Sequence, residues 1–187
     1  MAKKEEEMKL MIASDIHGSK YYCEKLLVRY MEETPDKLIL LGDILYHGPR
    51  NDLPKEYDPK TVIRLLNLVK EHLICVRGNC DTEVDQMVLE FPILADYSWI
   101  FVDGITMYLT HGHKYNIDNI PPMNPHEILI YGHTHIPMAQ ENEQGIFLNP
   151  GSVAIPKENS EHGYIVYEKG TFVWKNLEGK EYLTYKY

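Results

Sequence analysis

Five short apolar segments of this 187-residue chain are each followed directly by a loop that combines glycine with Asp, Asn or His. The loops are SDIHGS (14–19), GDILYHGP (42–49), RGNCD (77–81), HGH (111–113) and GHTH (132–135). Because ligands of open α/β sheets bind outside the carboxyl ends of the strands, the five loops can converge on one place. Carboxylate, imidazole and amide oxygen, without a matched pair of thiolates, suit Mn, Fe, Co, Ni or Zn in a catalytic site. The pattern therefore predicts an α/β fold with a metal site at one sheet edge.

The first half of the chain alternates predicted strands and helices. Buried strands are expected over 8–13, 37–41 and 73–76, because these runs are short and almost wholly apolar. Between them, apolar residues over 20–33 recur at helical spacing after the candidate N-cap Ser19, and Asp58-Pro59 opens a second helix. Two strand–helix–strand units predict a parallel sheet with helices packed on it.

The second half contains only predicted strands and turns. The strands are expected over 97–102, 105–110, 127–131, 136–140, 145–148, 164–168, 171–175 and 182–187. Asp103-Gly104 between the first two is a strong hairpin signal, so we expect mostly antiparallel pairing in a second sheet that packs on the first. Residues 1–7 have no apolar position to bury and are predicted to be a disordered tail, which leaves 8–187 as a single domain. Tyr182, Tyr185 and Tyr187 suit either the face of a sheet or a contact between copies in a homo-oligomer.

Charge and composition exclude several classes of partner. Lys and Arg total 19 against 28 Asp and Glu, a net charge of −9, which argues against an extended nucleic-acid surface. No apolar run approaches the roughly 18 residues of a membrane helix, and no signal-peptide pattern opens the chain. Three cysteines without paired spacing fit a reducing compartment. We therefore expect a cytoplasmic protein without membrane or polymeric nucleic-acid partners.

The order of the motifs, D-x-H, GD, GN-x-D, a Gly-flanked His and G-H-T-H, resembles the calcineurin-like metallophosphoesterases. Within that family the chain is similar to the small bacterial phosphodiesterases of the YfcE type. The resemblance runs from Met8 over nearly the whole chain and includes SDIHGS, GDILYHGPRN, VRGNCD, THGH, YGHTH and FLNPGSV. It implies a four-layer αββα sandwich, in which two mixed β-sheets are flanked by helices.

The resemblance also implies a dinuclear metal centre. One ion would bind Asp15, His17, Asp43 and His135, and the second would bind Asp43, Asn79, His111 and His133. Asp43 would bridge the ions by giving one carboxylate oxygen to each. Two divalent cations, two carboxylates and a bridging hydroxide leave a local charge near +1, which attracts a phosphate ester despite the negative chain. The hydroxide is the expected nucleophile. Mn is the expected metal, and Zn, Ni, Fe and Co also fit the donors.

Cys80 departs from the family pattern, because many relatives carry a His there that is thought to protonate the leaving alkoxide. A thiol donates a proton less readily than imidazolium at neutral pH, so the enzyme would favour esters with good leaving groups or depend on water for protonation. The alternative is that Cys80 only packs. The other catalytic candidates are Asp81, which could orient Cys80 or cap a helix starting at Thr82, and His113, a neighbour of the ligands. His47 and Arg50 are candidates for substrate binding, and turn or surface roles are open for both.

Two readings of the chain as a whole remain. The first is a metal-dependent phosphodiesterase that acts on a small or accessible phosphate ester. The alternative is a catalytically silent binding scaffold of the same fold, like the retromer subunit. The complete set of ligand positions favours the enzyme. A third possibility, a DNA-repair nuclease, lacks support because the chain has neither the length nor the positive surface to hold DNA.

Overall fold

The structure is a computed structural model that describes residues 8–187, so the tail predicted for residues 1–7 lies outside the described residues. It contains a six-stranded sheet in the order β11-β10-β9-β1-β2-β3 and a five-stranded sheet in the order β4-β5-β6-β8-β7. Across residues 8–187, none of the helices combines the length and the apolar character that crossing a membrane requires.

The centre of the six-stranded sheet is the parallel unit that the sequence predicts. Its strands are β1 (Leu10–Ala13), β2 (Lys37–Leu40) and β3 (Leu73–Cys75), connected through α1 (Lys20–Glu33), α2 (Pro59–Asn67) and the short 3-10 turn η1 (Lys70–His72). Both predicted helix starts are confirmed. The Ser19 hydroxyl accepts from the backbone N–H of Tyr22, and the Asp58 carboxylate accepts from that of Thr61.

The last three strands join this sheet, so the prediction that the later strands form a separate sheet is wrong for them. β9 (Gly163–Glu168) pairs antiparallel with β1 and is followed by β10 (Thr171–Asn176) and β11 (Glu181–Lys186). Strand β1 is buried along its whole length, and its second edge has backbone groups that need partners. β9 supplies them, and this long-range pairing has no local sequence signature. The register of β10 and β11 shifts between Trp174 and Lys175.

The five-stranded sheet is mixed. Its strands are β4 (Tyr97–Val102), β5 (Ile105–Thr110), β6 (Ile128–Ile130), β7 (Pro137–Asn142) and β8 (Gly145–Pro150). The β4–β5 and β7–β8 hairpins are antiparallel, as predicted, whereas β6 lies parallel to both of its neighbours. A parallel β6 places the loops after β5 and β6 at the same edge of the sheet.

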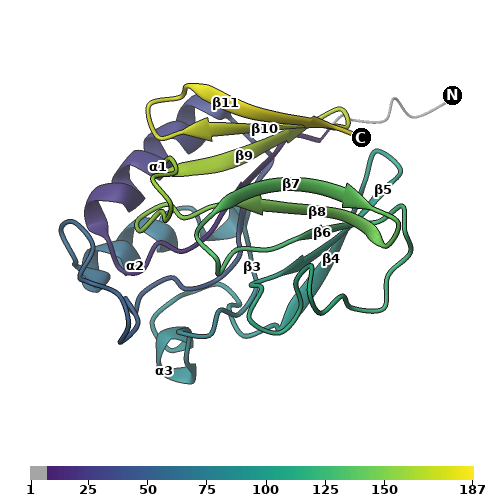
Figure 1. Ribbon diagram of the computed structural model, residues 1–187. Helices are drawn as coiled ribbons and strands as arrows, with labels where there is room; N and C mark the ends of the chain where they lie inside the picture. The colour runs from purple at the N-terminus through teal and green to yellow at the C-terminus, as the bar shows by residue number, and fades with distance from the viewer. Residues whose placement is uncertain (1–7) are drawn as a thin grey trace, which may run out of the picture.

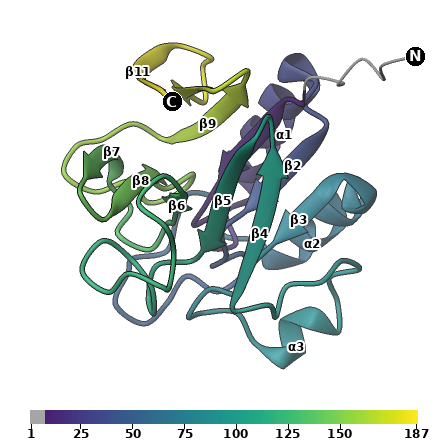
Figure 2. The same ribbon diagram turned by 90° about the vertical axis from the view of Figure 1, so that its right-hand side faces the viewer.

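The alternation of side chains along β1 shows how the layers pack. Leu10 and Ile12 enter the core between the two sheets, whereas Met11 and Ala13 face the core under α1 and α2. Figures 1 and 2 show α1 and α2 on one side of the paired sheets. The predicted sandwich of two mixed sheets is confirmed. On the outer face of the second sheet, the described covering layer is the loop 112–127, whose Tyr115 and other apolar residues pack on that sheet.

Candidate metal centre

The five loops identified in the sequence follow β1, β2, β3, β5 and β6 and meet beside the ends of these strands. Backbone hydrogen bonds hold them to one another: His17 N–H donates to Asp43 O at 2.9 Å, and Gly132 N–H donates to His111 O at 2.8 Å. The loop of Asp43 is in turn joined to the loop of Cys80, because Cys80 N–H donates to Asp43 Oδ1 at 2.8 Å. Segments far apart in the sequence therefore present their polar side chains to a common centre.

Five of the seven predicted ligands have left-handed backbone conformations. The φ angles are 60° at Asp15, 48° at His17, 54° at Asp43, 65° at His133 and 62° at His135. Such angles are uncommon for residues with a Cβ, although Asp and His tolerate them better than most. Strain of this kind concentrates where the surrounding structure holds a functional site. Here it occurs at ligands two positions apart, Asp15 and His17 in one loop and His133 and His135 in another.

Two glycines allow the loops to approach closely. A Cβ at Gly78 would lie 2.1 Å from Asp43 Oδ1, and a Cβ at Gly132 would lie 2.0 Å from Ser14 Oγ. Neither position could accommodate a side chain unless the backbone moved. The glycines of the RGNCD and GHTH motifs are therefore explained by packing between the loops.

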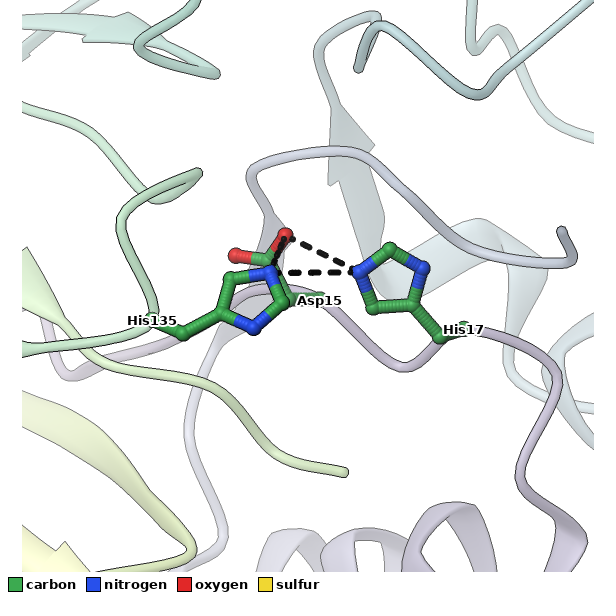
Figure 3. Close-up of side chains that lie close together, drawn as sticks. All are labelled: Asp15, His17 and His135. Carbon is green, nitrogen blue, oxygen red and sulfur yellow. Dashed lines mark hydrogen bonds and ion pairs between the residues drawn. The ribbon is translucent and has the colours of Figure 1, made fainter. Parts of the chain in front are cut away.

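Asp15, His17 and His135 form the first cluster (Figure 3). The Nε2 atoms of the two imidazoles are 3.3 Å apart, and they lie 3.5 Å (His17) and 3.2 Å (His135) from Asp15 Oδ1. All three side chains are almost completely buried. Ligand bonds of about 2.0–2.1 Å place tetrahedral donors about 3.3–3.4 Å apart, so this spacing suits a transition-metal ion.

Hydrogen bonds on the far side of each ring determine which nitrogen can bind a metal. Nδ1 of His17, His111 and His135 lies 2.7 Å from the carbonyl oxygens of Tyr46, Leu41 and Ile155, respectively. A carbonyl only accepts, so each Nδ1 carries a proton and each neutral ring directs the lone pair of Nε2 inward. Backbone carbonyls of this kind orient metal-binding histidines.

His111, Asn79 and His133 form the second cluster. His111 Nε2 lies 3.1 Å from Asn79 Oδ1 and 3.2 Å from His133 Nδ1. His133 thus differs from the other three histidines, because it directs Nδ1 rather than Nε2 into the cluster. Carboxylate, amide oxygen and imidazole together are the donor set of a catalytic metal site.

Asp43 lies between the clusters, but its geometry differs from the sequence expectation of one oxygen for each ion. Oδ1 accepts the backbone N–H of Cys80, whereas Oδ2 lies 3.8 Å from His17 Nε2 and 3.5 Å from His111 Nε2. A single oxygen therefore faces both clusters. The sequence could not show this, because it depends on the backbone N–H of Cys80, which binds Oδ1 only in the folded chain.

The pKa values of these groups reflect burial opposed by close opposite charge. Burial alone would raise the pKa of Asp15, yet His135 and His17 hold it well below its usual range. Burial would lower the pKa of His111, but the hydrogen bond with Asp43 raises it to about 9. Burial and the neighbouring His111 lower the pKa of His133 to about 4. Without a cation, the site thus balances its carboxylates with protons on imidazole.

The buried oxygen Asp15 Oδ1 is a further sign that the residues of the first cluster fit a divalent ion. Asp15 Oδ1 is buried and accepts no hydrogen bond from the described residues, although an orphaned carboxylate oxygen is costly in a protein interior. It lies close to Nε2 of His17 and Nε2 of His135, and the lone pairs of these nitrogens in the neutral rings are directed toward the same centre. A cation at this point would satisfy all three donors at once.

Asp81 is outside the described lining of the cavity but supports the loops that form the centre. Its carboxylate accepts three backbone N–H groups, from Asp43 at 2.8 Å, Ile44 at 2.9 Å and Gly78 at 2.7 Å. Burial raises the pKa of Asp81 in spite of these bonds. The predicted helix-capping role is wrong, because Thr82 itself caps α3 (Glu83–Gln86), and the bonds hold the loops of Asp43 and Gly78 together.

The remaining candidates lie at different distances from the centre. Cys80 and Arg50 line a cavity of about 430 Å³ that opens over the two clusters, together with His17, Asp43, Asn79, His133 and His135. His113 lies beside the second cluster, with its ring centroid 5.4 Å from that of His111. The ring of His47 packs edge-on against Tyr46 and Tyr57, and its side chain is not among the described lining of the cavity.

Three supporting residues were not among the candidates named from the sequence. The Asn149 amide donates to Gly132 O and to the Thr134 hydroxyl, so it fixes the GHTH loop. The Ser152 hydroxyl donates to Asp15 O, which fixes the first loop. Lys157 lines the cavity and adds a positive charge. The NPGS motif was the available signal for the first two, whereas nothing in the sequence marks Lys157.

Comparison with known proteins matches the chain to one family. The sequence profile of the calcineurin-like phosphoesterase superfamily domain matches residues 8–171. Phosphodiesterase YfcE from Escherichia coli strain K12 is 46% identical over 157 residues, which cover 84% of this chain and 85% of that protein. Phosphodiesterase MJ0936 from Methanocaldococcus jannaschii is 24% identical over 151 residues, which cover 77% of this chain and 83% of that protein.

Solved structures show the same fold. The E. coli phosphoesterase Yfce superimposes with a TM-score of 0.93 at 41% identity, covering 96% of this chain and 99% of that one. Wild-type Vps29 from Entamoeba histolytica, complexed with zinc, gives a TM-score of 0.59 at 19% identity, covering 96% and 99% of the two chains. The second likeness concerns the fold alone.

Proposed function

The chain belongs to the calcineurin-like phosphoesterase superfamily, and we propose that it is a dinuclear metal-dependent phosphodiesterase that acts on a small or accessible phosphate diester. The observation that carries this proposal is the position of Asp43 Oδ2, which faces a histidine of each cluster at 3.5 Å and 3.8 Å. A carboxylate oxygen shared in this way suits two ions held close together, as in-line attack on phosphorus requires.

The ligands would be those expected from the sequence: Asp15, His17, Asp43 and His135 for one ion, and Asp43, Asn79, His111 and His133 for the other. When bound, the two ions would lower the pKa of water to supply the nucleophile and would stabilise the charge that develops on the phosphoryl oxygens. We propose Mn as the working metal, with Zn, Ni, Fe and Co able to bind the same donors.

The other residues of the cavity would bind and orient the substrate. Arg50 and Lys157 line the same cavity as the ligands and carry positive charge, which suits a phosphate anion. Asp81 would keep the loops of Asp43 and Gly78 in register through its three backbone hydrogen bonds.

Cys80 would act as a weak acid at most. Burial and the nearby Asp43 raise the pKa of its thiol far above neutrality, so the thiol keeps its proton at pH 7. A poor acid beside the leaving group favours alcohols that depart without protonation. We therefore propose that the enzyme prefers diesters with good leaving groups. The three free thiols of the chain support a reducing compartment, and we propose the cytoplasm.

The alternative is a catalytically silent scaffold of the same fold. The experiment that separates the two is hydrolysis of bis(4-nitrophenyl) phosphate and of 4-nitrophenyl phosphate by metal-stripped protein to which Mn, Zn, Ni, Fe or Co is returned. We expect activity only with metal, and greater activity on the diester. Absence of hydrolysis with every metal would favour the scaffold.

A further inference from the structure

A second cavity of about 380 Å³ lies next to the metal-facing cavity, and we call it the apolar groove. Its main apolar walls are Leu45, Tyr46 and Ile63 from the segment before and within α2, and Val84 and Val88 from α3 and the turn after it. Cys80 lines both the apolar groove and the metal-facing cavity. Cys80 therefore forms part of the wall of both spaces, which adjoin at this side chain.

The apolar groove is also close to the proposed centre of reaction. Cys80 N–H donates to Asp43 Oδ1, and the other oxygen of the same carboxylate faces both ligand clusters. Gly48 lies beside the thiol, since a Cβ there would be 3.4 Å from Cys80 Sγ. A substituent that leaves a phosphorus atom at the centre on the side of Cys80 is therefore directed toward the apolar groove.

The charges in the two cavities differ. Among the described residues of the apolar groove, Asp85 is the one with a charge, and its carboxylate already accepts the N–H and hydroxyl of Thr82. Arg50 and Lys157 line the metal-facing cavity instead. An anionic group would therefore be drawn to the centre, whereas the described lining of the apolar groove has no cationic side chain for a second phosphate or a carboxylate.

Apolar side chains of the groove are left in water. Val84 is 68% exposed, Val88 is 43% exposed and Tyr46 is 42% exposed. Covering them with a hydrocarbon or aromatic group would stabilise a complex through removal of apolar surface from water. A cavity with apolar walls beside a few convergent polar groups is the usual form of a small-molecule site.

We propose, on the basis of the proposed phosphodiesterase function, that the apolar groove binds an esterified alcohol of the substrate. The substrate class is then a phosphodiester in which at least one alcohol is aliphatic or aromatic and carries no further charge. The phosphate lies at the ligand clusters and the apolar substituent passes Cys80 to rest against Val84 and Val88.

Binding of unreactive phosphonates tests this assignment without relying on turnover. Methylphosphonate and hexylphosphonate differ only in apolar length, so calorimetric titration of the Mn-loaded protein isolates the contribution of the groove. We expect hexylphosphonate to bind at least about tenfold more tightly, because several methylene groups leave water. In the double variant Val84→Ser, Val88→Ser the ratio should fall to about twofold while the affinity for methylphosphonate stays the same.

Val28→Ser is the matched control, because Val28 is 48% exposed on α1 and lines neither cavity. It should keep the full ratio. If the double variant loses its cooperative melting transition, the single variant Val84→Ser, at the most exposed of the groove positions, replaces it and should lower the ratio at least threefold.

Equal affinity of the wild type for the two phosphonates, or no binding of either, would overturn the assignment. A double variant that changes oligomeric state but keeps the ratio would also overturn it, because a second copy of the chain would then be the occupant. A retained ratio in a protein that hydrolyses no diester would contradict the phosphodiesterase activity and leave the apolar groove as a binding site.

Discussion

The Nε2 atoms of His17 and His135 face each other at 3.3 Å, although neither neutral ring has a proton to place between them. Each ring donates its Nδ1–H to a backbone carbonyl, His17 to that of Tyr46 and His135 to that of Ile155. Two lone pairs at this distance repel unless a proton or a metal ion lies between them. A metal ion bound by both Nε2 atoms would remove this repulsion and would replace the protons that the imidazoles carry without it.

Removal of ligands should abolish turnover and leave the fold intact. His135→Ala deletes a donor of one cluster, whereas Asp43→Asn weakens the oxygen that faces both. Each should lower kcat/KM by more than about a hundredfold, since even partners outside the ligand set change metal affinity tenfold to a hundredfold. Metal content by atomic emission should fall in both variants, and far-UV circular dichroism should match the wild type. His126→Ala, at a histidine outside the described metal clusters and cavity, is the control. Wild-type activity in either ligand variant would contradict the ligand assignment.

Metal binding should tighten as the pH rises toward about 9. In the metal-free protein, burial would lower the pKa of His111, but the hydrogen bond with Asp43 raises it from 6.5 to about 9. A metal can bind His111 Nε2 only after the imidazolium has lost its proton. Between pH 7 and 8.5 the affinity for Mn should therefore rise by up to about tenfold per pH unit for each proton displaced. Calorimetry in two buffers of different ionisation enthalpy would measure the proton release. Identical heats in the two buffers, with affinity independent of pH, would contradict this prediction.

The stability of the metal-free protein should have the opposite dependence. His111 has a folded pKa above its unfolded value, so its contribution is complete below about pH 6.5 and is lost as the pH rises through about 9. Thermal melts of the metal-stripped protein at pH 6.5 and pH 9 check the sign of this effect. His111→Gln should remove this part of the difference.

Asp81→Asn should destabilise the protein and weaken the metal site. The carboxylate accepts three backbone N–H groups, and the amide of Asn would turn a donor toward at least one of them. We expect a loss of about 2 kcal/mol of unfolding free energy, or about 4–8 °C in Tm for a chain of this size. Metal affinity should fall as well, because Asp43 and Gly78 are held by the same bonds. The exposed variant Asp52→Asn provides the comparison, and an Asp81→Asn protein with unchanged melting and metal affinity would show that the three bonds contribute little.

Cys80→His should speed the hydrolysis of esters with poor leaving groups more than that of activated ones. An imidazolium donates a proton at neutral pH, whereas the raised pKa of the Cys80 thiol prevents easy donation. Rates on an alkyl 4-nitrophenyl phosphate and on a dialkyl phosphate measure the two cases. Cys80→Ala separates proton donation from packing, and equal effects of Cys80→His on both substrates would refute the role in leaving-group protonation.

Local patterns in the sequence were sufficient for much of the fold and for the composition of the site. Ser19 and Asp58 begin the first two helices as their capping chemistry indicates, and the β4–β5 hairpin turns at Asp103-Gly104. The residues of the two clusters were all contained in the five glycine-bearing loops. These features were accessible because each depends on residues a few positions apart.

Interactions between distant segments needed the tertiary structure. The pairing of β9 with β1 is selected by the open edge of a buried strand rather than by any motif in β9. Thr82 rather than Asp81 caps α3, because the Asp81 carboxylate is already bound to the backbone of another loop. Lys157 reaches the cavity only because the chain after β8 returns to the GHTH loop, where its N–H donates to His135 O.

The sequence by itself determined which donors this protein brings together, since Asp, Asn and His beside glycine at strand ends leave few other uses for so many metal-binding side chains. The tertiary structure alone decided how each donor is directed. Backbone carbonyls hold the Nδ1 protons of His17, His111 and His135, and the N–H of Cys80 occupies Asp43 Oδ1, so that Oδ2 faces both clusters. The physical reason is that a side chain's chemistry is local, whereas its orientation depends on hydrogen bonds from segments that meet only in the folded chain.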